Sequence, residues 1–226
     1  MDIQLHYEER GEGMPMVLLH GNGEDHDYFR KQIEYFSKKY KVVAVDTRGH
    51  GKSPRGTAPF TLKQFAEDLK CFLDAHGWKK VILLGFSDGG NIALLFTLKY
   101  PEYVERLILN GANINPKGVR ASIQIPIIMG YYMTKFFARF SEKARRNTEM
   151  LGLMVTQPNI LPDRLEKITC PVLVIVGDKD MIALNHTKLI GWKIPNSRLK
   201  ILKGDHFLAD KEADSFNAAV EEFLSA

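Results

Sequence analysis

The chain has 226 residues, of which 45% are hydrophobic and 26% are charged, a balance typical of a globular protein that buries one full core. Its N-terminal residues lack the basic and then apolar pattern of a secretory signal, and no apolar run is long enough to span a membrane. Cys71 and Cys170 are too few for a disulfide framework and lack the spacing of metal ligands. We therefore expect a cytoplasmic protein without a membrane span, with both thiols buried and reduced.

The first part of the chain alternates short apolar runs with helical patterns. Strands are predicted at residues 3–7, 16–19 and 42–46, and helices at 27–40 and 62–76. Thr61 is a suitable N-cap for the second helix, and Gly77 closes it. Glycine-rich loops follow the second and third strands, at 20–23 and 47–54.

The stretch from Val81 to Leu95 places a serine between an apolar strand and a helical pattern. Its Gly-x-Ser-x-Gly turn holds Ser87 in a strained backbone conformation, and the flanking glycines let the strand and the helix pack closely. The start of the helix adds free backbone N–H groups and a partial positive charge. We interpret Ser87 as a nucleophile because of this context, since the three fixed residues alone would arise by chance in roughly a tenth of such chains.

Three further strands are predicted at residues 104–110, 171–177 and 198–202. Most strands are apolar on both faces and alternate with helices, which predicts an α/β fold with a mostly parallel sheet covered by helices on both sides. Active sites of such sheets lie at the carboxyl ends of the strands.

Between Gly111 and Thr169 this alternation stops, and an aromatic-rich stretch of helical period takes its place. We expect a helical cap at residues 113–169, inserted into a core formed by 1–112 and 170–226. Two or three helices are expected, separated at Pro116, Pro126, Pro158 and Pro162. If the apolar face of the cap roofs the cleft, the side chains that would bind an acyl or aromatic group are Tyr131, Tyr132, Phe136 and Phe137.

The cap also carries almost the entire net charge of the chain. Seven basic residues and two acids lie between Ile114 and Ile160, whereas the rest of the chain is about neutral. Such an excess can mark an anionic partner, but no nucleic-acid-binding module accompanies it. A solvated helix face is the interpretation we favour, and no nucleic-acid partner is expected.

A serine hydroxyl needs a base to take its proton, and the base needs a carboxylate to orient it. Asp178 and Asp180 follow one late strand and His206 follows the next, so both loops lie at the same sheet edge as Ser87. The order Ser87, Asp180, His206 is the order expected for this chemistry on this kind of sheet. His20 and His50 also follow strands, but their glycine neighbours indicate that they shape loops by hydrogen bonding, with an approach of His50 to the cleft as the alternative.

Hydrolysis also requires two donors aimed at the charge that develops on the substrate carbonyl, each worth about 3 kcal/mol. The backbone N–H of Asp88, directly after the serine, supplies one. The other is expected from the loop at 21–23, at Asn22. A plain turn is the alternative role for that loop, and an interaction with the helix dipole is the alternative for the Asp88 carboxylate.

Five ordered motifs together resemble the α/β-hydrolase superfamily in its esterase, lactonase and C–C hydrolase region. They span His20–Gly23, Asp46–Ser53, Gly85–Gly90, Gly177–Asp180 and Asp205–Phe207. The resemblance implies the α/β-hydrolase fold and favours Asp180 over Asp178 as the acid of the triad. Phe207, beside the histidine, is taken as a further substrate contact.

Three features depart from the usual pattern of that superfamily. The chain starts where members are typically in their second strand, so about seven strands are expected. Asp205 replaces the glycine that usually precedes the histidine, and its role stays open. The cap is short, which suggests an open site.

From these residues we expect a serine hydrolase that cleaves a small or medium carboxylic ester or thioester through an acyl-enzyme, with no metal or organic cofactor. C–C bond hydrolysis or perhydrolysis on the same triad is an alternative. A non-catalytic ligand-binding protein on a hydrolase fold is a second alternative, of another class. The substrate is expected to be a small ester-like molecule, and the sequence leaves the choice between monomer and homo-oligomer open.

Overall fold

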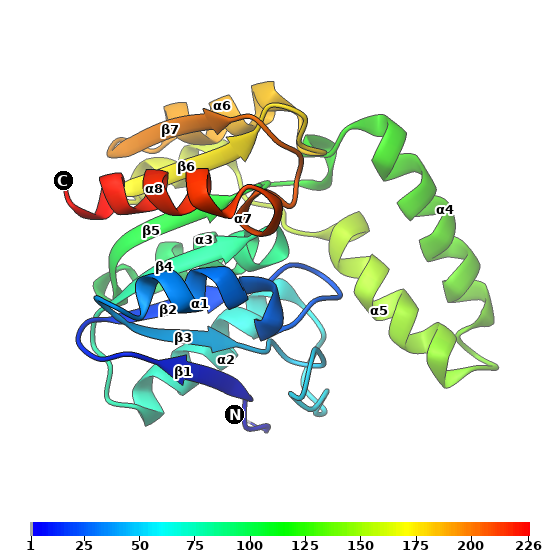
Figure 1. Cartoon of the computed structure of the whole chain (residues 1–226). Helices are drawn as coiled ribbons and strands as arrows, with labels where there is room; N and C mark the ends of the chain where they lie inside the picture. Colours follow the sequence, from blue (N-terminus) through cyan, green and yellow to red (C-terminus); the bar gives the residue numbers. More distant parts are fainter. Residues whose placement is uncertain (1) are drawn as a thin grey trace.

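The structure is a computed structural model that describes residues 2–226, in which seven strands form one sheet in the order β1-β3-β2-β4-β5-β6-β7 (Figure 1). β1 pairs with β3 in the antiparallel direction, and all other neighbours are parallel. The strands are β1 Tyr7–Arg10, β2 Pro15–Leu19, β3 Lys41–Val45, β4 Val81–Phe86, β5 Val104–Asn110, β6 Val172–Gly177 and β7 Ser197–Leu202. The mostly parallel sheet of about seven strands predicted from the sequence is thus confirmed.

Helices cover both faces of this sheet because the central strands are apolar on both sides. In β4, Val81 and Leu83 face one helical layer, whereas Ile82 and Leu84 face the other, and all four are buried. One layer consists of α2 Leu62–Ala75, α3 Asp88–Lys99 and α6 Leu184–Lys193. The other consists of α1 Arg30–Phe36, α7 Leu208–Lys211 and α8 Ala213–Leu224.

Two helices between β5 and β6 form a hairpin that stands out beyond the carboxyl ends of the strands (Figure 1). They are α4 Ala121–Phe137 and α5 Glu142–Thr156, and short 3-10 turns lie at His26–Phe29, Pro101–Tyr103, Pro116–Gly118 and Pro162–Lys167. Of the helices in residues 2–226, none combines the length and the apolar character needed to cross a bilayer.

Three local expectations were wrong. The first strand begins at Tyr7 and not at Ile3, because the residues before it turn towards the Arg48 guanidinium, which binds Asp2. Pro126 does not end a helix but lies inside α4, where packing against α5 holds the helix together. Cys71 is exposed on α2 and Cys170 is only partly buried, so neither thiol is buried as expected, although both are free.

Candidate active site

The turn between β4 and α3 holds Ser87 in an unusual conformation. Its φ of 52° is positive, and among residues 2–226 no other residue except glycine shares this feature. A side chain at Gly89 would overlap the Leu19 carbonyl, and one at Gly85 would overlap the backbone of Gly89. The glycines are therefore required so that strand and helix can close around the serine, as the motif predicts.

The three residues expected to form a catalytic triad are joined by two successive hydrogen bonds, between Asp180 and His206 and between His206 and Ser87. His206 Nδ1 lies 2.8 Å from Asp180 Oδ1, and His206 Nε2 lies 3.0 Å from Ser87 Oγ. The carboxylate favours the tautomer in which Nδ1–H donates to Asp180, so Nε2 is free to accept the serine proton. His206 and Asp180 are buried, whereas Ser87 is partly exposed, and this arrangement can take up a substrate at the serine.

The neighbouring acids have other partners. Asp178 is exposed and accepts a hydrogen bond from the backbone N–H of Gly204. Asp205, whose role the sequence left open, accepts from the Phe207 N–H and pairs with Lys211, which holds the pKa of its carboxyl below the usual range. Neither contacts the imidazole, so Asp180 is the acid that the geometry joins to His206.

The two backbone amides expected to bind an oxyanion are free of protein acceptors within the described part of the chain, at Asn22 and at Asp88. Asp88 is the first residue of α3, where backbone N–H groups have no acceptor in the helix. Its carboxylate accepts from the Asn22 and Asn91 side-chain amides, at 2.9 Å and 3.0 Å. Burial raises the pKa of Asp88, although the hydrogen bonds from these two amides act to lower it. The Asn22 side chain also donates to the Met150 carbonyl of α5.

Glu24 and Tyr28 lie next to the site and were missed by sequence reasoning. Burial raises the pKa of Glu24 from 4.5 to about 7, although its carboxylate accepts from the Gly21 N–H. The Tyr28 ring stacks on Phe86 at 4.3 Å, and Phe86 in turn contacts the His206 ring. The signal that could have found Glu24 is its position directly after the glycine loop at a strand end.

Gly111 is a third residue that sequence reasoning did not single out. It follows β5 with a φ of 59°, and a Cβ there would lie 2.8 Å from the His206 ring and 3.2 Å from Asp180 Oδ2. The absence of a side chain thus makes room for the imidazole and its carboxylate.

Other histidines take structural contacts. His20 Nε2 accepts from the Thr47 N–H and Nδ1 donates to the Gly21 carbonyl, while burial lowers the pKa of His20 to about 3. His50 Nδ1 lies 3.0 Å from the Arg48 carbonyl, and burial lowers the pKa of His50. Both contacts agree with the loop-shaping role expected for these two side chains.

His6, His26 and Asp46 form the group whose atoms are placed to hold a metal ion, since their ligand atoms lie within 4.8 Å of one another. Each histidine Nδ1 is already hydrogen-bonded to the Asp46 carboxylate, at 2.9 Å and 2.7 Å. Asp46 also accepts from the Lys52 N–H. These bonds are sufficient to explain the cluster as a tie between the N-terminal segment and the loop after β3.

The structure brings Phe207, but not the four aromatic residues expected on α4, to His206. The Phe207 ring centroid lies 5.8 Å from that of His206. Tyr132, Phe136 and Phe137 are exposed on α4, and Tyr131 packs towards Gly152 of α5. Within residues 2–226, no hydrogen bond or ring contact joins these four side chains to Ser87 or His206, so their role in substrate binding stays a prediction.

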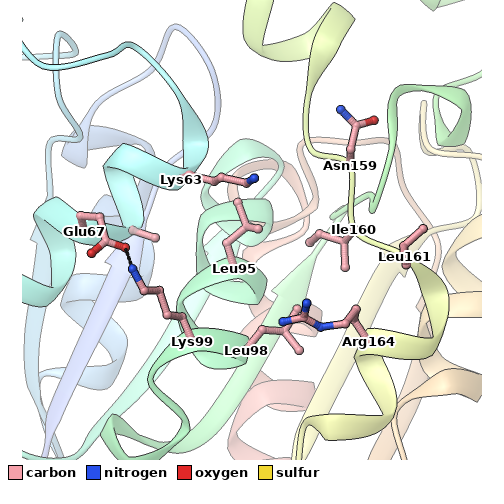
Figure 2. A pocket seen from close by; sticks show the side chains of 10 residues that line it. Lys63, Glu67, Leu95, Leu98, Lys99, Asn159, Ile160, Leu161 and Arg164 are labelled. Carbon is pink, nitrogen blue, oxygen red and sulfur yellow. Dashed lines mark hydrogen bonds and ion pairs between the residues drawn. The ribbon is translucent and has the colours of Figure 1, made fainter.

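A pocket of about 540 Å³ lies between α2, α3 and the segment at 159–164 (Figure 2). Leu95 and Leu98 line it together with Lys99, which pairs with Glu67 at 2.8 Å. Ser87, Asp180 and His206 do not line it, so this pocket is separate from the site at Ser87.

Comparison with known proteins gives consistent matches. A family model described as alpha/beta hydrolase fold matches residues 14–151. The chain is 33% identical to serine hydrolase BPHL of Homo sapiens over 98% of this chain and 83% of that protein. It is 28% identical to 2-hydroxy-6-oxo-6-phenylhexa-2,4-dienoate hydrolase of Comamonas testosteroni, over 99% and 92%. The solved enol-lactonase from Burkholderia xenovorans LB400 shares the fold, with a TM-score of 0.83 at 21% identity over 99% of this chain and 97% of that one.

Proposed function

The chain belongs to the alpha/beta hydrolase family, and we propose that it is a serine hydrolase of small or medium carboxylic esters or thioesters. The observation that carries this proposal is the linked geometry of Ser87, His206 and Asp180, with both hydrogen bonds at 3.0 Å or less. The similarity to a protein named serine hydrolase over nearly the whole chain supports it.

In the proposed mechanism, Ser87 Oγ attacks the carbonyl carbon of the substrate while His206 Nε2 takes the hydroxyl proton. Asp180 holds the Nδ1–H and stabilises the imidazolium that forms. The backbone N–H groups of Asn22 and Asp88 bind the oxyanion of the tetrahedral intermediate. His206 then gives its proton to the leaving alcohol or thiol, and a water molecule, deprotonated by the same imidazole, hydrolyses the acyl-enzyme.

C–C bond hydrolysis is the second candidate reaction. It is favoured by the similarity to the Comamonas testosteroni hydrolase, whose name describes a dienoate substrate of that protein. Ester and dienoate substrates present a carbonyl to the same serine, so the triad alone does not separate them. A non-catalytic binding protein is less well supported, because ligand binding alone requires no hydrogen-bonded serine, histidine and aspartate.

Labelling with a fluorophosphonate probe tests the proposed nucleophile. Wild-type protein is expected to label stoichiometrically and to turn over chromogenic acyl esters, whereas Ser87→Ala should fold normally and do neither. Ser215→Ala, at an exposed serine of α8, is the matched control and should behave as wild type. Stoichiometric labelling of Ser87→Ala would move the nucleophile elsewhere, and an unlabelled wild-type protein would favour the binding-protein alternative.

A substrate panel separates the two reactions. Acyl esters and thioesters of graded chain length would be compared with a dienoate that offers only a C–C bond. The proposal predicts higher kcat/KM for the esters. A dienoate hydrolysed faster than every ester would establish C–C hydrolysis as the main reaction.

A further inference from the structure

The outer side of α4 carries a row of exposed apolar side chains, here called the apolar stripe. Its members are Ile125, Met129, Tyr132, Met133, Phe136 and Phe140, the last just after the helix. Their exposed fractions lie between 56% and 74%. Spacings of three and four residues place them on one side of the helix. Single exposed apolar residues are common, but a contiguous row of this size marks an interaction surface.

The opposite side of α4 already has a partner. A Cβ added at Gly130 would lie 3.5 Å from Leu151 Cδ1, and one added at Gly152 would lie 3.4 Å from the Tyr131 ring, so the two helices approach closely here. The Gln124 side chain donates to the Met154 carbonyl at 3.2 Å. The contact between α4 and α5 therefore uses the inner side of the helix, and within residues 2–226 nothing covers the apolar stripe.

The end of the hairpin adds a cluster of cations to this stripe, here called the basic tip. It contains five basic residues and a single acid, Glu142, which pairs with Arg146 and Arg145. The basic residues are Lys135, Arg139, Lys143, Arg145 and Arg146. Within residues 2–226, Lys135, Arg139 and Lys143 have no ion-pair partner.

The cations and the apolar side chains share one surface. The Arg139 guanidinium lies 4.9 Å from the centre of the Phe136 ring and 4.8 Å from that of Phe140. An arginine in this position can extend its charge towards phosphate groups while the rings enter an apolar phase. Apolar and aromatic side chains on one side of a helix, flanked by lysine and arginine, are the features of helices that lie in a membrane interface.

We propose that the apolar stripe and the basic tip dock on an anionic lipid surface. Figure 1 shows that the hairpin stands away from the sheet, so its tip can reach a bilayer while α5 stays on the core. A second copy of the chain fits this surface less well, because its own α4 end carries the same excess of positive charge, whereas an anionic lipid surface complements that charge. The inference goes beyond the proposed function, since peripheral binding to lipid requires no turnover.

Sedimentation with lipid vesicles tests the proposal. The full chain is expected to bind vesicles that contain about 30% phosphatidylserine at least tenfold more strongly than vesicles of pure phosphatidylcholine. Raising the salt from about 0.1 M to about 1 M should remove most of this difference, because the screening length falls from about 10 Å to about 3 Å. Equal weak binding to both vesicle types would overturn the proposal.

Two double variants separate the apolar and the charged contributions. Met133→Ser with Phe140→Ser should weaken binding to the anionic vesicles about tenfold or more, since these side chains would no longer enter the interface. Trp192→Ser, at an exposed tryptophan of α6, is the matched control and should bind as wild type. If Trp192→Ser lost as much vesicle binding as the double variant, the apolar stripe would not be the docking surface.

Arg139→Gln with Lys143→Gln should lower the preference for anionic lipid about tenfold or more. The matched control is Lys38→Gln with Lys79→Gln, at exposed lysines outside the cap, which should have little effect. Sedimentation velocity without lipid distinguishes the other occupant of the surface. The proposal would be overturned if the protein did not bind vesicles but formed a dimer, and if the double variant Met133→Ser with Phe140→Ser dissociated that dimer. The surface would then be assigned to a second copy of the chain.

The outcome is independent of the proposed triad. Ser87→Ala should bind vesicles as wild type does, because Ser87 belongs to neither the apolar stripe nor the basic tip. If the protein binds anionic vesicles but shows no hydrolysis, only the proposed function is contradicted. If it hydrolyses esters but does not bind anionic vesicles, only the lipid-binding proposal is contradicted.

Discussion

Two aspartates in one loop differ in burial and in hydrogen-bond partners. Asp180 is buried and reaches His206, and its Oδ1 also accepts from the Ile182 N–H at 2.7 Å. Asp178 is exposed and holds the Gly204 N–H. The sequence placed both at the correct sheet edge, but only the turn between them decides which one reaches the imidazole.

We expect Asp180→Asn to lower kcat of ester hydrolysis about a thousandfold or more, because an amide favours the wrong tautomer of His206. Asp178→Asn should lower it less than tenfold, since the loss is one exposed hydrogen bond. Steady-state kinetics of both variants on one ester is the measurement. The reverse ranking would assign the orienting role to Asp178.

Glu24 is expected to make stability depend on pH near neutrality. Its folded-state pKa is raised from 4.5 to about 7, so between these values the folded protein binds this proton more tightly than the unfolded chain. The stabilisation is fully present below about pH 4.5, is lost as the pH rises to about 7, and stays lost above it. After allowance for solvent screening of this partly exposed group, the loss is about 1 kcal/mol.

Urea unfolding of Glu24→Gln and wild type at several pH values tests this. The variant should lack this part of the pH dependence, so its stability relative to wild type should rise between about pH 5 and pH 8. Glu12→Gln, at an exposed glutamate, is the control and should run parallel to wild type. A difference between Glu24→Gln and wild type that does not change with pH would contradict the assignment.

At the scale of the elements, the close contact between β2, β4 and α3 depends on a glycine. A Cβ at Gly89 would overlap the Leu19 carbonyl, and backbone cannot move as a flexible side chain can. Gly89→Ala should therefore lower the free energy of unfolding by about 3 kcal/mol or more.

Gly191 of α6 is the matched control, because the nearest atom to its Cβ would be Leu199 Cβ, at an ordinary 3.7 Å. Gly191→Ala should leave stability unchanged or raise it by up to about 1 kcal/mol, since alanine is the better helix former. Urea unfolding midpoints compare the two variants. Similar midpoints would mean that the turn around Ser87 relaxes more easily than its geometry indicates.

The sequence predicted the central elements best. The strands at 104–110 and 172–177 were placed to within one residue, because continuous apolar runs between helices have few other solutions in a parallel sheet. Thr61 was correctly identified as a cap, since its hydroxyl accepts from the Gln64 N–H. These features depend on neighbours that are close in sequence or on burial from both sides.

The cap was predicted less well for a physical reason. α4 is apolar on nearly all sides, so periodicity could not decide which side meets α5 and which stays exposed. Glu24 was missed because its pKa depends on burial, which distant segments create. The first strand was misplaced because the ion pair between Asp2 and Arg48 is a contact of long range.

In the molecule as a whole, three contacts join α5 and the residue after it to the core, whereas α4 packs mainly on α5. Arg55 makes two hydrogen bonds to the Glu149 carboxylate, at 2.6 Å and 2.9 Å. The next residue, Met150, accepts from Asn22, and the Gln157 side chain accepts from the Leu62 N–H. The cap is thus tied to the same loop that is proposed to bind the oxyanion.

The ion pair between Arg55 and Glu149 should therefore control how firmly the cap stays in place. Single and double alanine variants at these positions should show a coupling of about 0.5 to 1 kcal/mol in the free energy of unfolding, a modest value because both side chains are about one-third exposed. Glu149→Gln should also speed hydrogen exchange of the α5 amides near Met150, measured by mass spectrometry. Glu67→Gln, which breaks the pair with Lys99 on the core, should leave α5 unchanged. If the α5 amides exchange at the wild-type rate in Glu149→Gln, the hydrogen bonds of Asn22 and Gln157 are sufficient to hold α5 on the core. The ion pair would then make no contribution to the stability of this contact.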